Sequence, residues 1–291
     1  MRIAVWQTGS ADLGQLRSRA LEAAAAGARL LVVPEAFTSG YAVPGIADLA
    51  QPADGPWAQE IAAIAAEAGL AILYGFPERD GDRVFNSAQL IDGGLIAGQL
   101  TESSAQPTGE DSHLRTQLAK HRKCHLYGDV DLASYSPGDG FTALAELDGV
   151  RVGIAICYDV EFPEAVRTLA LAGADLVAVP TALMRPYEVV ARTIVPARAY
   201  ENQVYVAYAN RSGAEGTLLY CGESCVVGPD GSDLARAGSG DELLLAEIDP
   251  ARLAMSRADN THLSDRRPAL YRSLIEERPV AEAVTEKETA R

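Results

Sequence analysis

The sequence predicts an α/β protein, because strand-like and helix-like segments alternate along most of its length. Apolar residues make up 48% of the 291 residues, which is enough for a substantial core. The length lies within the range of a single large α/β domain. We find no interdomain linker and no short-period repeat. We therefore expect one domain over residues 1–272 and a partly disordered tail over 273–291, which has little to bury.

In the first half of the chain, apolar runs of strand length are separated by segments with helical periodicity. Strands are predicted at 2–7, 28–35, 70–78 and 84–92, and helices at 12–27 and 56–68. The first of these helices ends at a glycine, a common residue at the end of a helix.

A polar segment at 101–119, "TESSAQPTGEDSHLRTQLA", interrupts this pattern. About twenty polar residues inside a compact domain usually form a functional loop or a disordered insert. Both alternatives remain open here, as a lid over the site or as a disordered segment.

The second half repeats the alternation of strands and helices. A strand at 151–157 is followed by a helix that starts at Pro163, where proline suits a first helical turn. Further strands are predicted at 174–182, 203–210, 223–231 and 242–249, and a long helical segment at 187–202. The "PDG" at 229–231 is typical of a turn.

The net charge of −15 argues against nucleic acid as a partner, because phosphate binding needs a basic surface. It weakly favours neutral or cationic small substrates. No uncharged run is long enough to span a bilayer, and the N-terminus lacks the apolar core of a signal peptide. The four cysteines form no CxxC pair and no zinc-like cluster with the four histidines. We expect a reduced, cytoplasmic protein that binds neither metal nor membrane.

Cys157 is the first candidate for chemistry, because it ends the apolar run "VRVGIAIC" directly before a turn into a helix. The alternative is a buried core cysteine. Three of the four histidines, His113, His121 and His125, lie in or beside the polar insert, and the fourth is His262. A Cys-His protease arrangement therefore has no well-placed histidine.

Carboxylates and a lysine offer another set of helpers. Glu35 ends an apolar strand, where it could lie exposed on a rim or be partly buried with a raised pKa suited to a general base. Lys123 stands just before a short segment that looks strand-like. It belongs either to a solvated basic cluster or to a site in which one lysine points inward.

Glu35, Lys123 and Cys157, each in its local context, resemble the motifs of the nitrilase superfamily of carbon–nitrogen hydrolases. The segments are "VVPEAFTSGY", "RKCHLYG" and "GIAICYDVEFPE", and the resemblance extends from Met1 to about Leu270. It implies a four-layer αββα sandwich, usually assembled as a homodimer or a higher homo-oligomer.

The resemblance also implies roles for these residues. Cys157 would be the nucleophile, Glu35 the base, and Lys123 with the backbone N–H of Tyr158 would stabilise the oxyanion. No metal or organic cofactor is needed. Many members carry a second glutamate where this chain has Asp131, with Asp129 as an alternative. Further candidate substrate-binding residues are Tyr41, Tyr158, Glu161, Thr181 and Ala182.

The Tyr158-Asp159 pair after the cysteine resembles the amidase and carbamoylase branches rather than nitrilases proper. Several segments most resemble 5-aminopentanamidases, so we expect hydrolysis of an aliphatic primary amide such as an ω-amino amide. An N-carbamoyl amine or amino acid is the leading alternative, with Arg185 as a possible cation for a substrate carboxylate. A catalytically inactive binding module on the same fold is the alternative from another class. Glu161, four residues beyond Cys157, either attracts a cationic substrate or favours the helix N-terminus.

Overall fold

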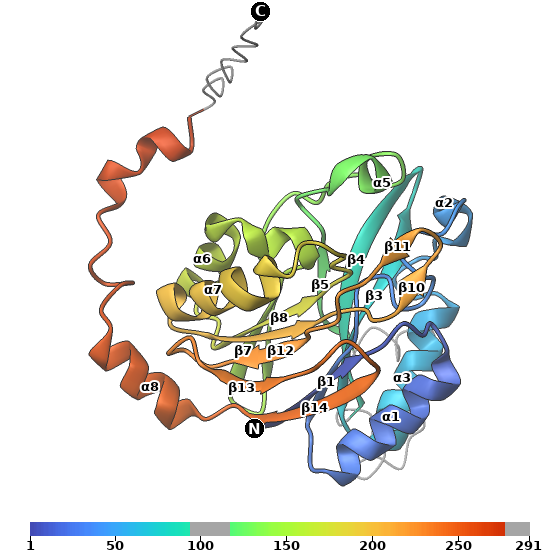
Figure 1. Ribbon diagram of the computed structural model, residues 1–291, viewed down its shortest axis with the longest axis horizontal. Helices are drawn as coiled ribbons and strands as arrows, with labels where there is room; N and C mark the ends of the chain where they lie inside the picture. Colours follow the sequence, from blue (N-terminus) through green and yellow to red (C-terminus); the bar gives the residue numbers. More distant parts are fainter. Residues whose placement is uncertain (94–116, 277–291) are drawn as a thin grey trace, which may run out of the picture.

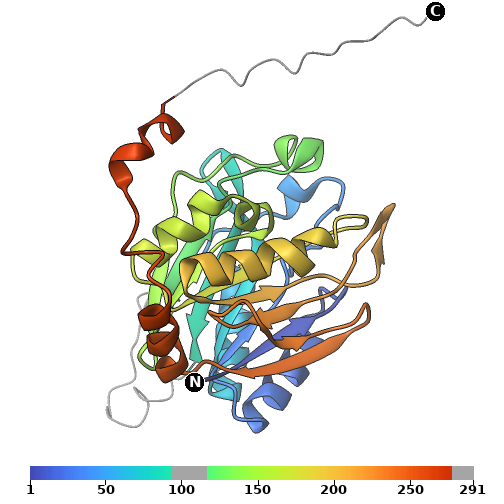
Figure 2. The same ribbon diagram turned by 60° about the vertical axis from the view of Figure 1, so that its left-hand side comes forward.

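The computed structural model describes residues 1–93 and 117–276, which form two six-stranded sheets packed face to face (Figure 1). Helices cover the outer face of each sheet, as the two views in Figures 1 and 2 show. This arrangement confirms the predicted αββα sandwich.

The first sheet has the strand order β14-β1-β2-β3-β4-β5. Strands β1, β2 and β3 are parallel, and the remaining neighbours are antiparallel. The strand bounds are β1 Arg2–Gln7, β2 Leu30–Val32, β3 Ala71–Asp80, β4 Arg83–Asp92, β5 Gln117–Arg122 and β14 Glu242–Glu247.

The second sheet has the strand order β13-β12-β9-β8-β7-β6. Its central strands β7, β8 and β9 are parallel. The strand bounds are β6 Leu144–Leu147, β7 Val150–Ile154, β8 Leu176–Pro180, β9 Tyr205–Ala209, β12 Cys225–Val227 and β13 Asp233–Arg236. A small hairpin, β10 (Ala214–Glu215) and β11 (Leu218–Leu219), extends from this half of the chain.

Side chains of the central strands are buried on both faces of each sheet. In β1, Ile3 and Val5 belong to the core between the sheets, while Ala4 and Trp6 pack toward the helices. This double burial explains why the strands read as nearly continuous apolar runs in the sequence.

Helices α1 (Leu13–Ala25) and α3 (Pro56–Ala68) cover the first sheet, and α6 (Pro163–Leu171) and α7 (Val195–Asn202) cover the second. A short π-helix, Val190–Ile194, leads directly into α7. The long helical segment predicted at 187–202 therefore consists of two joined helices. Shorter helices are α2 (Ile46–Leu49) and α5 (Gly128–Leu132).

After α8 (Pro250–Asp259) the chain runs away from the two sheets, as Figure 2 shows. Two short 3₁₀ turns, Pro268–Leu270 and Arg272–Leu274, follow in this stretch. Of the predicted tail, residues 277–291 lie outside the described residues. In the ranges that the structure describes, no helix is both long and apolar enough to cross a bilayer.

The structure corrects the sequence predictions around Lys123. The strand lies before the lysine, as β5, and not after it. Its register with β4 ends at the pair Arg122 and Ser87, and one more backbone bond runs from the Lys123 N–H to the Asn86 carbonyl at 2.8 Å. Residues 101–116 of the predicted insert lie outside the described residues, whereas 117–119 belong to β5. The sequence missed this strand because its only apolar residues are Leu118 and Ala119, and all of its side chains except His121 are only partly buried.

Candidate functional site

Glu35 lies three residues beyond β2, and its carboxylate is fully buried. Its Oε1 accepts hydrogen bonds from Lys123 Nζ at 2.7 Å and from Asn86 Nδ2 at 2.7 Å. Burial raises the pKa of Glu35, the Lys123 ammonium opposes this rise, and the nearby Asp131 carboxylate adds to it. The buried alternative for Glu35 is therefore correct, and the exposed rim position is wrong.

Strand β3 of the first sheet passes close to the backbone of Glu35. A Cβ added at Gly75 in β3 would clash with the backbone of Glu35 and Ala36, so a larger residue there would displace this turn. Ala36 itself has a φ of +47°, in the left-handed region that costs energy for residues other than glycine.

Lys123 directly follows β5 and is fully buried between two carboxylates. Its Nζ lies 2.7 Å from Glu35 Oε1 and 2.7 Å from Asp131 Oδ2. Burial works against the ammonium, but the charges of Glu35, Cys157 and Asp131 outweigh it and hold the pKa of Lys123 well above its usual value. The side chain points inward, so it is not part of a solvated cluster.

Of the two candidate aspartates, the structure brings Asp131 to the lysine. Asp131 is fully buried on α5, and its Oδ2 also accepts from the backbone N–H of Tyr127 at 2.9 Å. Asp129, on the same short helix, is exposed. The shorter side chain of an aspartate reaches Lys123 from α5, which starts five residues after the lysine.

Cys157 opens a 3₁₀ turn, Cys157–Glu161, that joins β7 to α6. Its φ is +46°, a strained value typical of functional turns. Burial and the nearby charge of Glu35 raise the pKa of the Cys157 thiol, while the charge of Lys123 and the Ala182 backbone oppose this rise. The thiol therefore lies close enough to both Glu35 and Lys123 to respond to their charges.

A buried aspartate links the lysine segment to the cysteine turn, and sequence reasoning missed it. Asp159 accepts from His121 Nε2 at 3.0 Å, from His125 Nδ1 at 2.9 Å and from the backbone N–H groups of His125 and Ile156. Burial would raise the pKa of Asp159, but the bonds from His121 and His125 lower it to about 2. The signal in the sequence is that both histidines lie two residues from Lys123.

The remaining predicted residues surround this centre. The Tyr41 ring lies 5.6 Å from Lys123 Nζ, and the Thr181 carbonyl accepts from the Glu35 N–H at 3.4 Å. Tyr158 packs edge-on against Tyr127, with ring centroids 5.3 Å apart. Glu161 is half-buried on the same turn as Cys157. Burial raises the pKa of Glu161, and the charges of Arg198 and Lys123 only partly oppose this rise.

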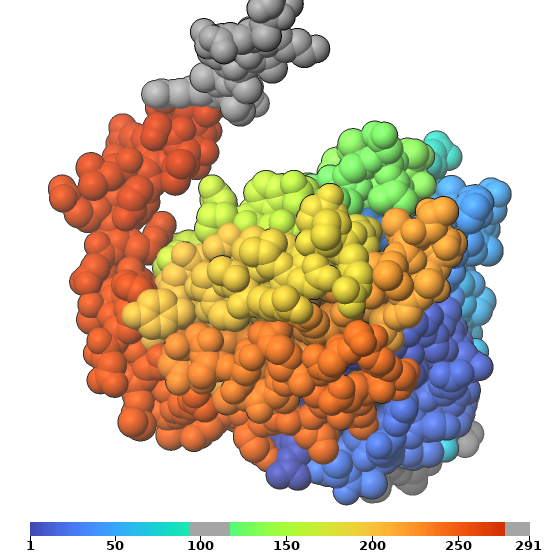
Figure 3. All heavy atoms as spheres, in the orientation of Figure 1, coloured from blue at the N-terminus to red at the C-terminus, as the bar shows by residue number. Residues whose placement is uncertain are grey.

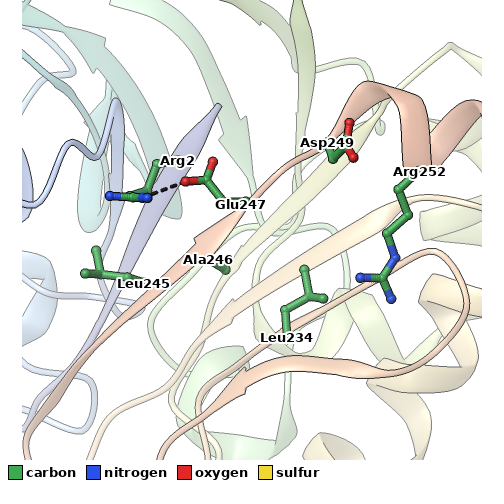
Figure 4. A pocket seen from close by; sticks show the side chains of 7 residues that line it. All are labelled: Arg2, Leu234, Leu245, Ala246, Glu247, Asp249 and Arg252. Carbon is green, nitrogen blue, oxygen red and sulfur yellow. Dashed lines mark hydrogen bonds and ion pairs between the residues drawn. The ribbon is translucent and has the colours of Figure 1, made fainter.

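Arg185 lies outside this centre. Its guanidinium is half exposed and lies 3.4 Å from Glu188. A separate groove runs between the edge strands β13 and β14 and the start of α8 (Figure 4). Among the described residues that line it, Arg2 pairs with Glu247, Arg252 pairs with Asp230, and Asp249 accepts from the Ala251 N–H at the start of α8.

Comparison with known proteins identifies the family of the chain. The family model of carbon–nitrogen hydrolases matches residues 2–258. The chain belongs to the carbon–nitrogen hydrolase family. Among its relatives, a Pseudomonas protegens protein described as "Hydrolase in pqqF 5'region" is 46% identical over 94% of this chain and 92% of its own.

Two further carbon–nitrogen hydrolase relatives are amidases. An (R)-stereoselective amidase from Pseudomonas sp. is 36% identical over 82% of this chain and 79% of its own. The solved structure of a mutant amidase from Nesterenkonia sp. AN1, with acrylamide added at its active-site cysteine, has a TM-score of 0.77. That amidase is 33% identical, and the match covers 94% of this chain and 99% of the other. The carbon–nitrogen hydrolase described here is an amide-hydrolysing enzyme.

Proposed function

We propose that this enzyme hydrolyses a small aliphatic primary amide through a thioester on Cys157. The observation that carries the proposal is that the buried Glu35 carboxylate bonds to the Lys123 ammonium and lies near enough to the Cys157 thiol to raise its pKa. A nucleophile, a base and a fixed cation are the groups that acyl transfer needs.

In the first half of the reaction, Sγ of Cys157 bonds to the amide carbon and its proton moves to the Glu35 carboxylate. Lys123 and the backbone N–H of Tyr158 stabilise the oxyanion. The C–N bond then breaks, and ammonia leaves with the proton from Glu35. In the second half, Glu35 takes a proton from water as the water attacks the thioester. The acid departs, and the proton returns to the thiol.

The replacement of Cys157 by alanine tests this proposal. Cys157→Ala should lower ammonia release from a panel of primary amides by more than about a thousandfold and leave the fold intact. Cys225→Ala removes a buried thiol from β12 and is the matched control. Appreciable hydrolysis by Cys157→Ala would remove the nucleophile assignment.

We propose that the substrate is an ω-amino amide such as 5-aminopentanamide, with its ammonium group near Glu161. This carboxylate lies on the turn that starts at Cys157, and no side chain in the described ranges donates a hydrogen bond to it. Tyr127 and Tyr158 pack nearby and offer aromatic faces to a cation. The N-carbamoyl amino acid alternative has less support, because Arg185 pairs with Glu188.

Glu161→Gln separates recognition of the cation from support of the turn. If Glu161 binds the ammonium, kcat/KM for 5-aminopentanamide should fall by about tenfold or more. Pentanamide, which has the same chain length and no charge, should be little affected. Equal losses on both amides would show that Glu161 supports the turn instead.

Other expectations from the sequence stay predictions. These are the homodimer or higher homo-oligomer, the cytoplasmic location and activity without a cofactor. Hydrolysis after exhaustive dialysis against a chelator, together with the mass in solution, would test the last and the first of these.

A further inference from the structure

The segment Glu35–Tyr41 carries two side chains of the proposed site, and it is held at both ends by residues that no motif assigned. At its start, the buried Arg211 donates from Nη1 to the carbonyls of Glu35 at 3.2 Å and of Ala36 at 3.3 Å. These bonds hold the backbone where Ala36 has its left-handed φ of +47°. Strained conformations of this kind persist only where the surroundings fix them.

At its other end, the segment is held by Glu215 of the β10–β11 hairpin. Both oxygens of this carboxylate accept from the backbone N–H of Tyr41 at 3.1 Å, and Oε2 also accepts from Ala42 at 3.2 Å. A Cβ added at Gly40, whose φ is +84°, would collide with the Glu215 carboxylate. Figure 3 shows the orange hairpin lying against the blue first part of the chain.

Tyr220 joins the two holding points. Its hydroxyl donates to Glu215 Oε2, and its ring lies 5.6 Å from the guanidinium carbon of Arg211. In the ranges described, Arg211 has no carboxylate within ion-pair distance, and its other bond goes to the carbonyl of Gly9 at 3.2 Å. The Arg211 guanidinium therefore bonds to backbone carbonyls and lies against an aromatic ring, and within those ranges it does not pair with an acid.

We infer that Arg211, Glu215 and Tyr220 form a clamp that positions the Glu35 carboxylate and the Tyr41 ring for catalysis. The inference rests on the role of Glu35 in the proposed function. The three are positioning residues, because each acts on the segment through backbone atoms or through another member of the clamp. The site depends on this segment because Glu35 must meet Lys123 and Cys157 together, and a displacement of about 1 Å can cost a hundredfold in rate.

Two conservative variants test the clamp. Glu215→Gln keeps the size of the side chain but removes the charge and one acceptor oxygen, and Tyr220→Phe removes only the hydroxyl. We expect kcat for an amide that the wild type cleaves to fall about ten- to a hundredfold in Glu215→Gln and less in Tyr220→Phe. KM should change little. Tyr205→Phe, which removes a buried hydroxyl bonded to the Asp249 carbonyl at 3.0 Å, is the matched control.

The pH profile distinguishes positioning from simple loss of stability. Glu35 is faced by Lys123, Asp131, Cys157 and Tyr41, and burial keeps its pKa raised. A loosened segment admits water, which lowers this pKa, so the acid limb of kcat/KM should move to lower pH. Lower stability would reduce the folded fraction without moving the limb. The pH dependence of Cys157 alkylation by iodoacetamide should shift in the same direction.

Three outcomes separate the clamp from the proposed function. If Glu35→Gln retains activity, the proposed role of Glu35 is wrong, and the inference of a clamp that positions it is overturned with it. If Glu35→Gln is inactive but both clamp variants match the wild type in kcat and in both pH profiles, the clamp alone is overturned. The clamp is also overturned if Glu215→Gln and Tyr220→Phe change no more than Tyr205→Phe.

Discussion

At the scale of single residues, the candidate site is a buried ammonium between two buried carboxylates. Lys123 lies 2.7 Å from both Glu35 and Asp131, and none of the three is exposed. Buried charges of this kind are stable only while they stay paired, so each side chain depends on the other two. Changes at any of them should therefore affect activity and stability together.

Replacing the lysine removes the only cation that, in the described ranges, bonds to the side-chain carboxylates of Glu35 and Asp131. Lys123→Met should lower kcat by about 10²–10³-fold, which is typical for the loss of one oxyanion donor. It should also cost about 3–5 kcal/mol in the free energy of unfolding, because two carboxylates are left unpaired. Lys120→Met, which changes a lysine in β5 that pairs with Glu78, is the control for both measurements. A Lys123→Met enzyme that turns over at the wild-type rate would contradict this role.

The two aspartates of α5 give a matched pair for a second prediction. Asp131→Ala should lower turnover severely, because it removes one of the two acceptors that orient Lys123. Asp129→Ala changes an exposed side chain and should stay within about 0.5 kcal/mol of wild-type stability, with unchanged turnover. Steady-state kinetics of both variants decide the matter. Greater sensitivity at Asp129 would refute the assignment of Asp131.

At the scale of elements, Asp159 holds together two segments that come from different sheets. Its carboxylate bonds to His121 in β5, to His125 beyond it, and to the backbone before Cys157. The segment after β5 and the turn after β7 are thus tied by one side chain, which lies outside the proposed chemistry.

This link gives a pH dependence with a defined sign. The pKa of Asp159 is about 2 in the folded protein, below its ordinary value of 3.8. The stabilisation is therefore fully present above about pH 4 and is lost as the pH falls toward 2. A shift of this size corresponds to about 2 kcal/mol. Denaturant unfolding at pH 6 and pH 3 should show about half of this loss in the wild type, because pH 3 still lies above the folded pKa, and a smaller loss in Asp159→Asn. Asp129→Asn, at an exposed position, should behave as the wild type.

The strand β5 sets the limit of a tolerated deletion. Removing 101–119 would take Gln117 and Ala119, which pair with Ile91 and Leu90 of β4, out of the strand that leads to Lys123. Removing only 101–116 would leave β5 whole. We expect the longer deletion to lower the melting temperature and turnover well below those of the shorter one. Equal behaviour of the two variants would show that the first half of β5 contributes nothing to the site.

At the scale of the whole molecule, the site forms where the two sheets meet. Glu35 and Lys123 follow strands of the first sheet, while Cys157 and Thr181 follow parallel strands of the second. Side chains beyond the carboxyl ends of parallel strands commonly form sites in α/β proteins. Here the apolar core between the sheets keeps the two sets in register, so the fold itself assembles the nucleophile with its base.

The sequence by itself determined the fold class, the αββα architecture through its motifs, and the approximate positions of most strands, although it missed β6 and β13 as well as β5. Apolar runs buried on both faces leave a strong signal, because every residue in them must avoid water. The turn at Cys157 could also be predicted from the sequence, because an apolar strand ends shortly before a proline that starts a helix. β5 left no such signal, because only Leu118 and Ala119 in it are apolar and both are only partly buried.

Only the tertiary structure decided which polar residues meet. It brought Asp131 rather than Asp129 to Lys123, placed His121 and His125 on Asp159, and set Arg211 and Glu215 against the segment that carries Glu35. The physical reason is that these bonds join residues as many as 176 positions apart in the chain. Local periodicity reports whether a side chain is buried, but the partner of a buried polar group is chosen by the packing of the two sheets.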